Sequence, residues 1–356
     1  MNIETVYTRF RKTVDRQGDA PFLHVLEETA QAYDIPQGDI SFNQMADRVE
    51  NWRKRFMEAG YGADHRVGLL LENRPVFLEI WLALNAIGAS VVPINPDLRL
   101  AELEYLAEHS EMILAIVLPE RLEEMKTAVE NTGIPTLVTT ADGQIPQAIR
   151  PAAADAVPNT DAGGHISLRQ NGERMLTPLP VFHMNAMAVS VMAMITVGGC
   201  LIMLDRFHPR SWWASVRKSG ATVVHYLGVM PPMLMRADPS EDDRNHNVRF
   251  GFGAGVDAKL HDPFEERYGF PLIEAWACTE TGSGGVICAN DEPRKTGTAC
   301  FGRPAKEVEV RVIDDAGKDV APGTPGEMLV RRAGDNPRYG FFSGYLKNQE
   351  ATDDLW

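Results

Sequence analysis

Apolar and polar positions along the first third of the chain follow the order helix, strand, helix, strand. Ser41 and Gln44 form a capping-box pattern at the start of a helical repeat that runs to about residue 59. The apolar run that follows, residues 67–71, is short and bounded by turn residues, which is typical of a buried parallel strand. We therefore predict an α/β fold with a largely parallel sheet. The same pattern predicts helices at 77–87 and 101–109 and strands at 91–94 and 113–117.

A second block of the chain repeats this order. Its pattern predicts helices at 186–197 and 210–218, each followed by a strand, at 200–204 and 222–227. The two blocks run at a nearly constant offset, which suits two related αβ subdomains with a ligand site in the crevice between them. Successive helix–strand units always look alike, however, so the sequence leaves both explanations open.

The character of the chain changes after about residue 291. Residues 308–312 alternate as an antiparallel strand, 315–318 read as a turn, and 326–330 begin another strand. This pattern predicts a small β-barrel-like subdomain. We expect subdomain A at 1–164, subdomain B with the ligand pocket at 165–290, and the β subdomain at 291–356, with 151–164 as a linker rich in Ala, Pro, Asp and Gly.

The composition is that of an ordinary folded protein. Of the 356 residues, 44% are apolar and 24% are charged. A net charge of −14 argues against a nucleic-acid-binding surface, because phosphate binding needs concentrated positive charge. Four cysteines far apart in the sequence fit neither a zinc site nor a disulfide framework and favour a reduced compartment, the cytoplasm: Cys200, Cys278, Cys288 and Cys300.

One uncharged stretch has to be weighed against a membrane span. Residues 175–204 contain no Asp, Glu, Lys or Arg, but Pro178, Pro180 and the pair Gly198-Gly199 interrupt them. What remains is long enough only for a buried helix and a short strand, so we predict no membrane span. The N-terminus shows no basic segment followed by an apolar core, and we predict no secretory signal peptide.

The strongest chemical pattern is the stretch 274–282, Glu-Ala-Trp-Ala-Cys-Thr-Glu-Thr-Gly, followed by Gly302-Arg303-Pro304 and Gly326-Glu327. In order and spacing these motifs resemble the adenylate-forming superfamily, the AMP-forming acyl-CoA synthetases and their relatives. The resemblance implies the adenylate-forming N-terminal domain fold. By itself, the segment Thr-Glu-Thr-Gly would also fit a helix N-cap followed by a first-turn acid.

The resemblance also assigns roles within this stretch. A carboxylate would attack the α-phosphate of ATP, with Mg²⁺ held by Glu280 and the phosphates contacted by Thr279. Trp276 stands where the family usually has a Tyr against the adenine, and Ala277 where it usually has Gly. The cofactor-binding residues implied here are Glu274, Ala275, Trp276, Ala277, Cys278 and Thr279.

Two further elements belong to the same resemblance. The loop Gly253-Ala254-Gly255 would line the adenine pocket; it is not a dinucleotide fingerprint, because Val256 occupies the final Gly position of G-x-G-x-x-G. A tight structural turn is the competing interpretation of this loop. The segment 179–184, Leu-Pro-Val-Phe-His-Met, resembles the family's P-L-F-H element, which makes His183 a catalytic candidate beside Thr279 and Glu280. A buried structural histidine explains it equally well.

Three parts of the family pattern are missing. Residues 161–168, Asp-Ala-Gly-Gly-His-Ile-Ser-Leu, contain no Ser/Thr/Gly-rich phosphate loop ending in Lys upstream of the P-L-F-H element. The T-G-D element and the C-terminal lid domain with its lysine are also not found. We expect that the sequence is either part of a longer ligase or a shortened form that binds a nucleotide or acid weakly.

The expected activity follows from the resemblance. Acid, ATP and CoA would give acyl-CoA, AMP and pyrophosphate, with Mg²⁺ as cofactor and the crotonobetaine/carnitine–CoA ligase branch as the nearest pattern, in the setting of fatty acid metabolism. Two alternatives stay open: a non-catalytic nucleotide- or acyl-binding remnant, and an adenylation domain that loads a carrier protein. The expected partners are the small or medium acid, ATP and CoA, with no nucleic acid, and a homodimer is left open.

Overall fold

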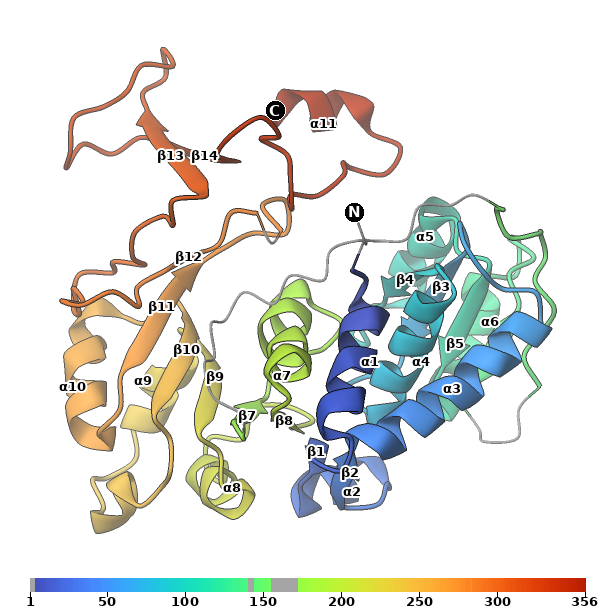
Figure 1. Ribbon diagram of the computed structural model, residues 1–356, viewed down its shortest axis with the longest axis horizontal. Coiled ribbons are helices and arrows are strands. Elements are labelled where there is room, and N and C mark those ends of the chain that lie inside the picture. Colours follow the sequence, from blue (N-terminus) through green and yellow to red (C-terminus); the bar gives the residue numbers. More distant parts are fainter. Residues whose placement is uncertain (1–3, 140–143, 155–171, 283) are drawn as a thin grey trace. The chain divides into compact units, whose positions relative to one another are not determined.

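The computed structural model describes residues 4–139, 144–154, 172–282 and 284–356 (Figure 1). The chain divides into two compact units, residues 1–208 and 209–356, which we call unit 1 and unit 2. Residues 161–168, where the family's phosphate loop is not found, and most of the predicted linker 151–164 lie outside the described residues. The predicted subdomain boundaries after residues 164 and 290 stay predictions.

A parallel sheet organises the first part of unit 1. Strands β3 (Arg66–Leu70), β4 (Ser90–Pro93), β5 (Leu114–Val117) and β6 (Thr136–Val138) pair in the order β4-β3-β5-β6, all parallel. All four residues of β5 are buried, as expected for a parallel strand covered on both faces. The predicted parallel α/β architecture is confirmed.

Four helices alternate with these strands or precede them: α3 (Phe42–Glu58), α4 (Pro75–Ala86), α5 (Leu100–Ser110) and α6 (Leu122–Ala128). Helix α4 contacts β4, α6 contacts β5 and β6, and α3 packs on α4. The predicted capping box is present: Ser41 Oγ accepts from the Gln44 N–H over 3.1 Å, and Gln44 Oε1 accepts from the Ser41 N–H over 2.8 Å. Buried side chains of α5 and α6 pack on those of β3 and β5 in one cluster that includes Leu70, Leu103 and Met125.

A second sheet in unit 1 joins distant parts of the chain. Strands β7 (Arg174–Thr177), β8 (Cys200–Met203) and β1 (Pro21–Val25) pair in parallel, and β2 (Gly38–Ser41) adds antiparallel to β1. Helix α1 (Val6–Gln17) packs against α3 and α4 (Figure 1). Unit 1 also contains the short elements α2 (Glu27–Tyr33) and η1 (Pro119–Arg121).

The uncharged stretch 175–204 divides into β7, a helical segment and β8. The helical segment starts as a π-helix, η2 (Ala186–Val191), and continues as α7 (Met192–Val197). The predicted helix is therefore present, but its first half has the wider i→i+5 geometry, which hydrophobic periodicity does not distinguish. No helix in the described residues has the length and apolar character needed to cross a membrane.

Unit 2 contains a second group of parallel strands. Strands β9 (Val223–Leu227), β10 (Phe250–Ala254) and β11 (Leu272–Trp276) pair in parallel with β10 in the middle, and the short β12 (Ile287–Cys288) is antiparallel to β11. The helical elements of this part are α8 (Trp212–Ser219), α9 (Met230–Met235), η3 (Glu241–Arg244) and α10 (Ala258–Tyr268), and α9 contacts α10 (Figure 1).

The end of unit 2 is a hairpin followed by a short helix. Strands β13 (Val308–Ile313) and β14 (Glu327–Arg332) pair antiparallel over their whole length, as the alternation predicted. Asp314 Oδ1 accepts from the N–H groups of Ala316 and Lys318, each over 2.9 Å, and closes the predicted turn. Helix α11 (Gln349–Asp354), N-capped by Asn348, is an addition that the sequence pattern did not predict.

His225 on β9 makes unit 2 sensitive to acid. Its side chain is 0% exposed, and burial lowers the pKa of the imidazole to about 3 from the ordinary 6.5. Between these values the unfolded chain binds a proton at His225 and the folded chain does not, so stability falls as the pH drops. We expect the free energy of unfolding, measured in urea, to fall between pH 7 and pH 5 in the wild type. In His225→Leu this fall should be smaller by roughly 2 kcal/mol. Parallel losses in the two proteins would contradict this.

Candidate nucleotide and metal site

The carboxylate of Glu274 points into unit 2 and holds the loop after β10. Glu274 is 5% exposed, its Oε2 accepts from the Gly255 N–H over 2.8 Å, and its Oε1 accepts from the Val256 N–H over 3.2 Å. The Tyr226 hydroxyl also donates to Oε1, and burial followed by the Glu274 charge raises the pKa of that phenol. Glu274 therefore links the ends of β9, β10 and β11.

The predicted adenine loop lies at the carboxyl end of β10. Gly253 is buried, Ala254 is half-buried and Gly255 is exposed. Gly255 has φ +82°, a conformation that side chains with a Cβ rarely adopt. A Cβ on Gly253 would lie 2.1 Å from the Tyr226 carbonyl oxygen, so both glycines have a structural reason. Their predicted contact with adenine stays a prediction.

An ion pair fixes the start of β11, the strand that carries Glu274. Arg294 donates to both carboxylate oxygens of Glu265, over 2.6 and 2.8 Å, and the Leu272 N–H donates to Oε1 over 2.8 Å. Burial raises the pKa of Glu265, but the hydrogen bonds from Arg294 and His261 outweigh it and hold the pKa at about 2. The strand that leads into the motif is therefore rigidly attached to α10.

The motif itself ends in a tight turn after β11. The Cys278 N–H donates to Thr281 Oγ1 over 3.1 Å, and that hydroxyl donates to the Cys278 carbonyl over 3.1 Å. Thr281 is buried at 7% exposure, whereas Ala277, Cys278 and Thr279 are exposed. The turn thus directs its second threonine inward and leaves the Thr279 hydroxyl accessible to a ligand.

Glu280 follows Thr279 and is half-buried. Its Oε1 accepts a hydrogen bond from the Tyr345 hydroxyl over 2.7 Å, and this bond lowers the pKa of the Glu280 carboxyl. The group is therefore an anion at neutral pH. Among the described residues no three His, Cys, Asp or Glu side chains form a metal-binding group. A single carboxylate fits Mg²⁺, which is usually held by one or two carboxylates together with substrate phosphates and water.

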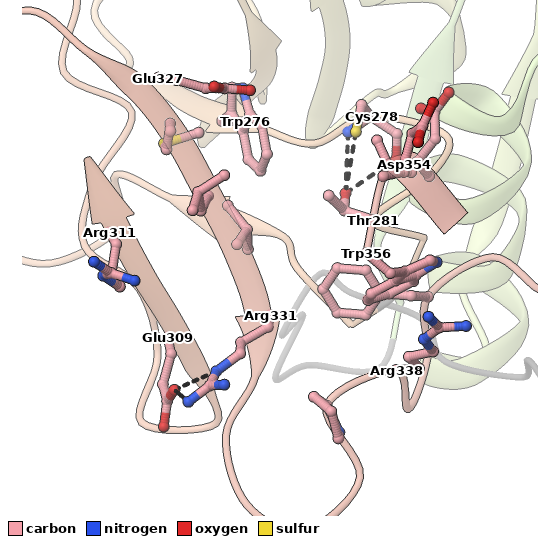
Figure 2. Close-up of a pocket in the computed structure, with 17 residues that line it drawn as sticks. Trp276, Cys278, Thr281, Glu309, Arg311, Glu327, Arg331, Arg338, Asp354 and Trp356 are labelled. Atoms are coloured by element: carbon pink, nitrogen blue, oxygen red, sulfur yellow. Dashed lines mark hydrogen bonds and ion pairs between the residues drawn. The ribbon is translucent and has the colours of Figure 1, made fainter. Parts of the chain in front are cut away.

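Glu280 lies on the wall of a pocket of about 720 Å³ within unit 2. Figure 2 shows Cys278 and Thr281 on one side of it with Trp356, and Glu309, Arg311 and Arg331 of the β13–β14 hairpin on the other. Trp276 is the last residue of β11, and its ring stacks on the ring of Phe301 with 6.2 Å between the ring centroids. The pocket is lined by Trp276, Cys278, Glu280, Thr281, Glu309, Arg311, Glu327, Met328, Leu329, Val330, Arg331, Pro337, Arg338, Phe341, Asp354, Leu355 and Trp356.

His183 belongs to unit 1. It is exposed and lies three residues before η2. Its Nδ1 accepts from the Asn185 N–H over 3.1 Å, which leaves Nε2 as the ring's donor when the imidazole is neutral. The buried side chain of Asn73 holds this loop: Asn73 Oδ1 accepts from the Val181 N–H over 2.8 Å. His183 is thus not a buried structural histidine, and its catalytic role stays a prediction.

The structure therefore gathers only some of the predicted residues. Trp276, Cys278 and Glu280 line one pocket, and the backbone of Ala275 pairs with β12. Tyr226 and Tyr345 were missed, although each contacts a predicted carboxylate. In the sequence, Tyr345 follows Gly344 in a pair that has the composition of a turn, which marks no chemical role. Nothing in the sequence pointed to Tyr226.

The fold and the motif turn together define an adenylate-forming protein. The model of the AMP-binding enzyme family matches residues 10–162 and 154–346, and the chain belongs to that adenylate-forming, acyl-CoA synthetase-like family. The benzoate CoA ligase of Burkholderia xenovorans has the same fold, with a TM-score of 0.81 over 99% of this chain and 75% of that one at 14% identity. The predicted fold class is thus confirmed.

Two sequence relatives are named as CoA ligases. The chain is 25% identical to a crotonobetaine/carnitine–CoA ligase of Salmonella arizonae, over 92% of this chain and 71% of the relative. It is 26% identical to a sulfoacetate–CoA ligase of Cupriavidus necator, over 89% of this chain and 69% of that relative. These relatives are carboxylate–CoA ligases, and such a family implies ATP and CoA as substrates. A non-catalytic remnant is not favoured by these comparisons.

Proposed function

We propose that this protein is an AMP-forming carboxylate–CoA ligase. A carboxylate oxygen of the acid attacks the α-phosphorus of ATP, the bond from that phosphorus to the bridging oxygen breaks, and pyrophosphate leaves. The CoA thiolate then attacks the acyl carbon, and AMP leaves with the oxygen. The observation that carries the proposal is the turn after β11, which presents an exposed Thr279 and an anionic Glu280 beside Trp276.

Each residue of the turn has a distinct task in this proposal. Glu280 supplies the hard oxygen for Mg²⁺, and bound Mg²⁺ would neutralise charge on the phosphates. Thr279 donates its hydroxyl to a phosphate oxygen, and Trp276 stacks against the adenine. Glu274 acts at a distance, by fixing the backbone at Gly255 and Val256. We assign His183 to the acyl and CoA side of the reaction.

The acid is proposed only as a class. The names of the two sequence relatives point to small carboxylic acids, and we propose a small acid here as well. Free CoA is the proposed acceptor; a thioester on a carrier protein would be the product of the alternative activity. The sequence lacks the family's Lys-ended phosphate loop, so nucleotide binding and turnover should be measured separately.

Glu280→Gln tests the proposal. In the purified chain supplied with ATP, Mg²⁺, CoA and a panel of small acids, we expect acid-dependent release of pyrophosphate, with AMP and acyl-CoA identified by mass. The variant removes the carboxylate charge but keeps the shape of the side chain, so the rate should fall by roughly a hundredfold with little change in unfolding.

The matched control is Glu350→Gln, a carboxylate that is exposed on α11 of the same unit. We expect its rate to equal that of the wild type. Undiminished pyrophosphate release in Glu280→Gln would contradict the role of Glu280. A wild-type chain that releases no pyrophosphate with any acid would contradict the ligase proposal as a whole.

A further inference from the structure

Backbone hydrogen bonds join residues 340–345 to the tight turn that follows β11. The Phe342 N–H donates to the Glu280 carbonyl over 3.0 Å, and the Gly284 N–H donates to the Gly340 carbonyl over 2.9 Å. A Cβ on Gly282 would lie 2.5 Å from the Gly340 carbonyl oxygen, so the two backbones approach as closely as glycine permits. This contact brings Tyr345 to Glu280 from 65 positions away.

Tyr345 is itself held from the opposite side by α11. Its backbone N–H donates to Thr352 Oγ1 over 2.9 Å, and that hydroxyl donates to the Asn348 carbonyl over 2.8 Å. Thr352 is buried at 4% exposure, and the ring of Phe342 meets the ring of Tyr345 edge-on at 4.9 Å. The phenol is therefore fixed before any ligand binds.

We propose that Tyr345 is a positioning residue that orients the Glu280 carboxylate for a divalent cation, an inference that rests on the proposed function. The Tyr345 hydroxyl donates to Oε1, and the Glu280 backbone and the Cys278 side chain also hydrogen-bond the carboxylate. A carboxylate has about four acceptor sites, so these contacts still leave room for a cation. Holding a half-exposed glutamate in one rotamer removes part of the entropy that the cation would otherwise have to overcome.

A positioning role and a merely structural role for Tyr345 predict different effects of removing its hydroxyl. If Tyr345 only fastens residues 340–345 to the turn, removal of its hydroxyl lowers thermal stability and leaves cation affinity unchanged. If it orients Glu280, cation affinity falls although the ring packing on Phe342 is kept. Carboxylate ligands in metal sites are typically supported by such hydrogen bonds, and their loss typically weakens binding by about 10- to 100-fold.

The test is a Mn²⁺ titration of the full chain in the presence of ATP, with free Mn²⁺ measured by electron paramagnetic resonance. We expect Tyr345→Phe to raise the dissociation constant of Mn²⁺ about tenfold and Glu280→Gln to raise it further. The control is Tyr339→Phe, since Tyr339 is 65% exposed in the same region and its ring lies over Arg332. This control should bind as the wild type does.

The outcomes separate the two proposals. Unchanged Mn²⁺ affinity in Tyr345→Phe, with weakened affinity in Glu280→Gln, would overturn the positioning role and leave the proposed function intact. Unchanged affinity in Glu280→Gln would overturn both. Tighter binding in Tyr345→Phe would show that the hydroxyl competes with the cation, which also overturns the inference.

Discussion

Asn73→Leu is expected to cost unit 1 about 5 kcal/mol of unfolding free energy, because three buried backbone groups lose their partner. Asn73 is 3% exposed, and its amide donates to the carbonyls of Leu179 and Leu204 over 3.1 and 2.8 Å while its oxygen accepts from the Val181 N–H over 2.8 Å. Leucine keeps the branched shape of asparagine and is larger, so the loss reflects missing hydrogen bonds and crowding and not a cavity. Urea denaturation followed by circular dichroism measures it.

A matched control for this variant is Asn51→Leu, at an exposed position of α3, where we expect a change within about 0.5 kcal/mol. Asn73→Asp should be as harmful as Asn73→Leu, since it places a carboxylate against two carbonyl oxygens. A loss below about 1 kcal/mol in Asn73→Leu would mean that the loop before His183 is held by other contacts.

Glu274→Leu is expected to destabilise unit 2 by about 4 kcal/mol, since the Tyr226 hydroxyl and the N–H groups of Gly255 and Val256 lose their acceptor. The effect exceeds that of a surface ion pair because the carboxylate is 5% exposed and water does not replace it. The midpoint of urea unfolding, followed by tryptophan fluorescence, measures the loss.

The comparison for this second variant is Glu266→Leu, an exposed glutamate on α10, which should change stability by no more than about 0.5 kcal/mol. The stability of Glu274→Gln should lie between those of Glu274→Leu and Glu266→Leu. Its amide keeps one acceptor but turns a donor toward the Gly255 N–H. Equal stability of Glu274→Leu and Glu266→Leu would refute the idea that Glu274 fastens the loop after β10.

Elements specified by neighbours in the sequence were predictable. The capping box at Ser41 involves residues three positions apart, and the buried run at 67–71 and the alternation at 308–312 have the periods of a parallel and an antiparallel strand. The geometry of η2 was not predictable, because i→i+4 and i→i+5 bonding place nearly the same residues inward. Helix α11 was missed because it is only 6 residues long.

The motif identified a family, and the resemblance assigned Glu280 to Mg²⁺ and Glu274 to cofactor binding. The stretch 274–282 does not show which of the two carboxylates is buried. In the structure Glu274 is buried and satisfies the backbone, whereas Glu280 is half-exposed at a pocket. Strand alternation and the tight turn at Thr281 separate them, because burial makes an acceptor structural and access makes it available to a ligand.

By itself the sequence determined the α/β class, the helices and strands with strong local signals, and membership of the adenylate-forming family. Only the tertiary structure decided which groups meet: Asn73 with Leu204, Glu274 with Gly255, and Tyr345 with Glu280. The physical reason is range. Helix caps and strand periodicity depend on residues a few positions apart, whereas these hydrogen bonds join residues 131, 19 and 65 positions apart and exist only once the sheets and the turn have packed.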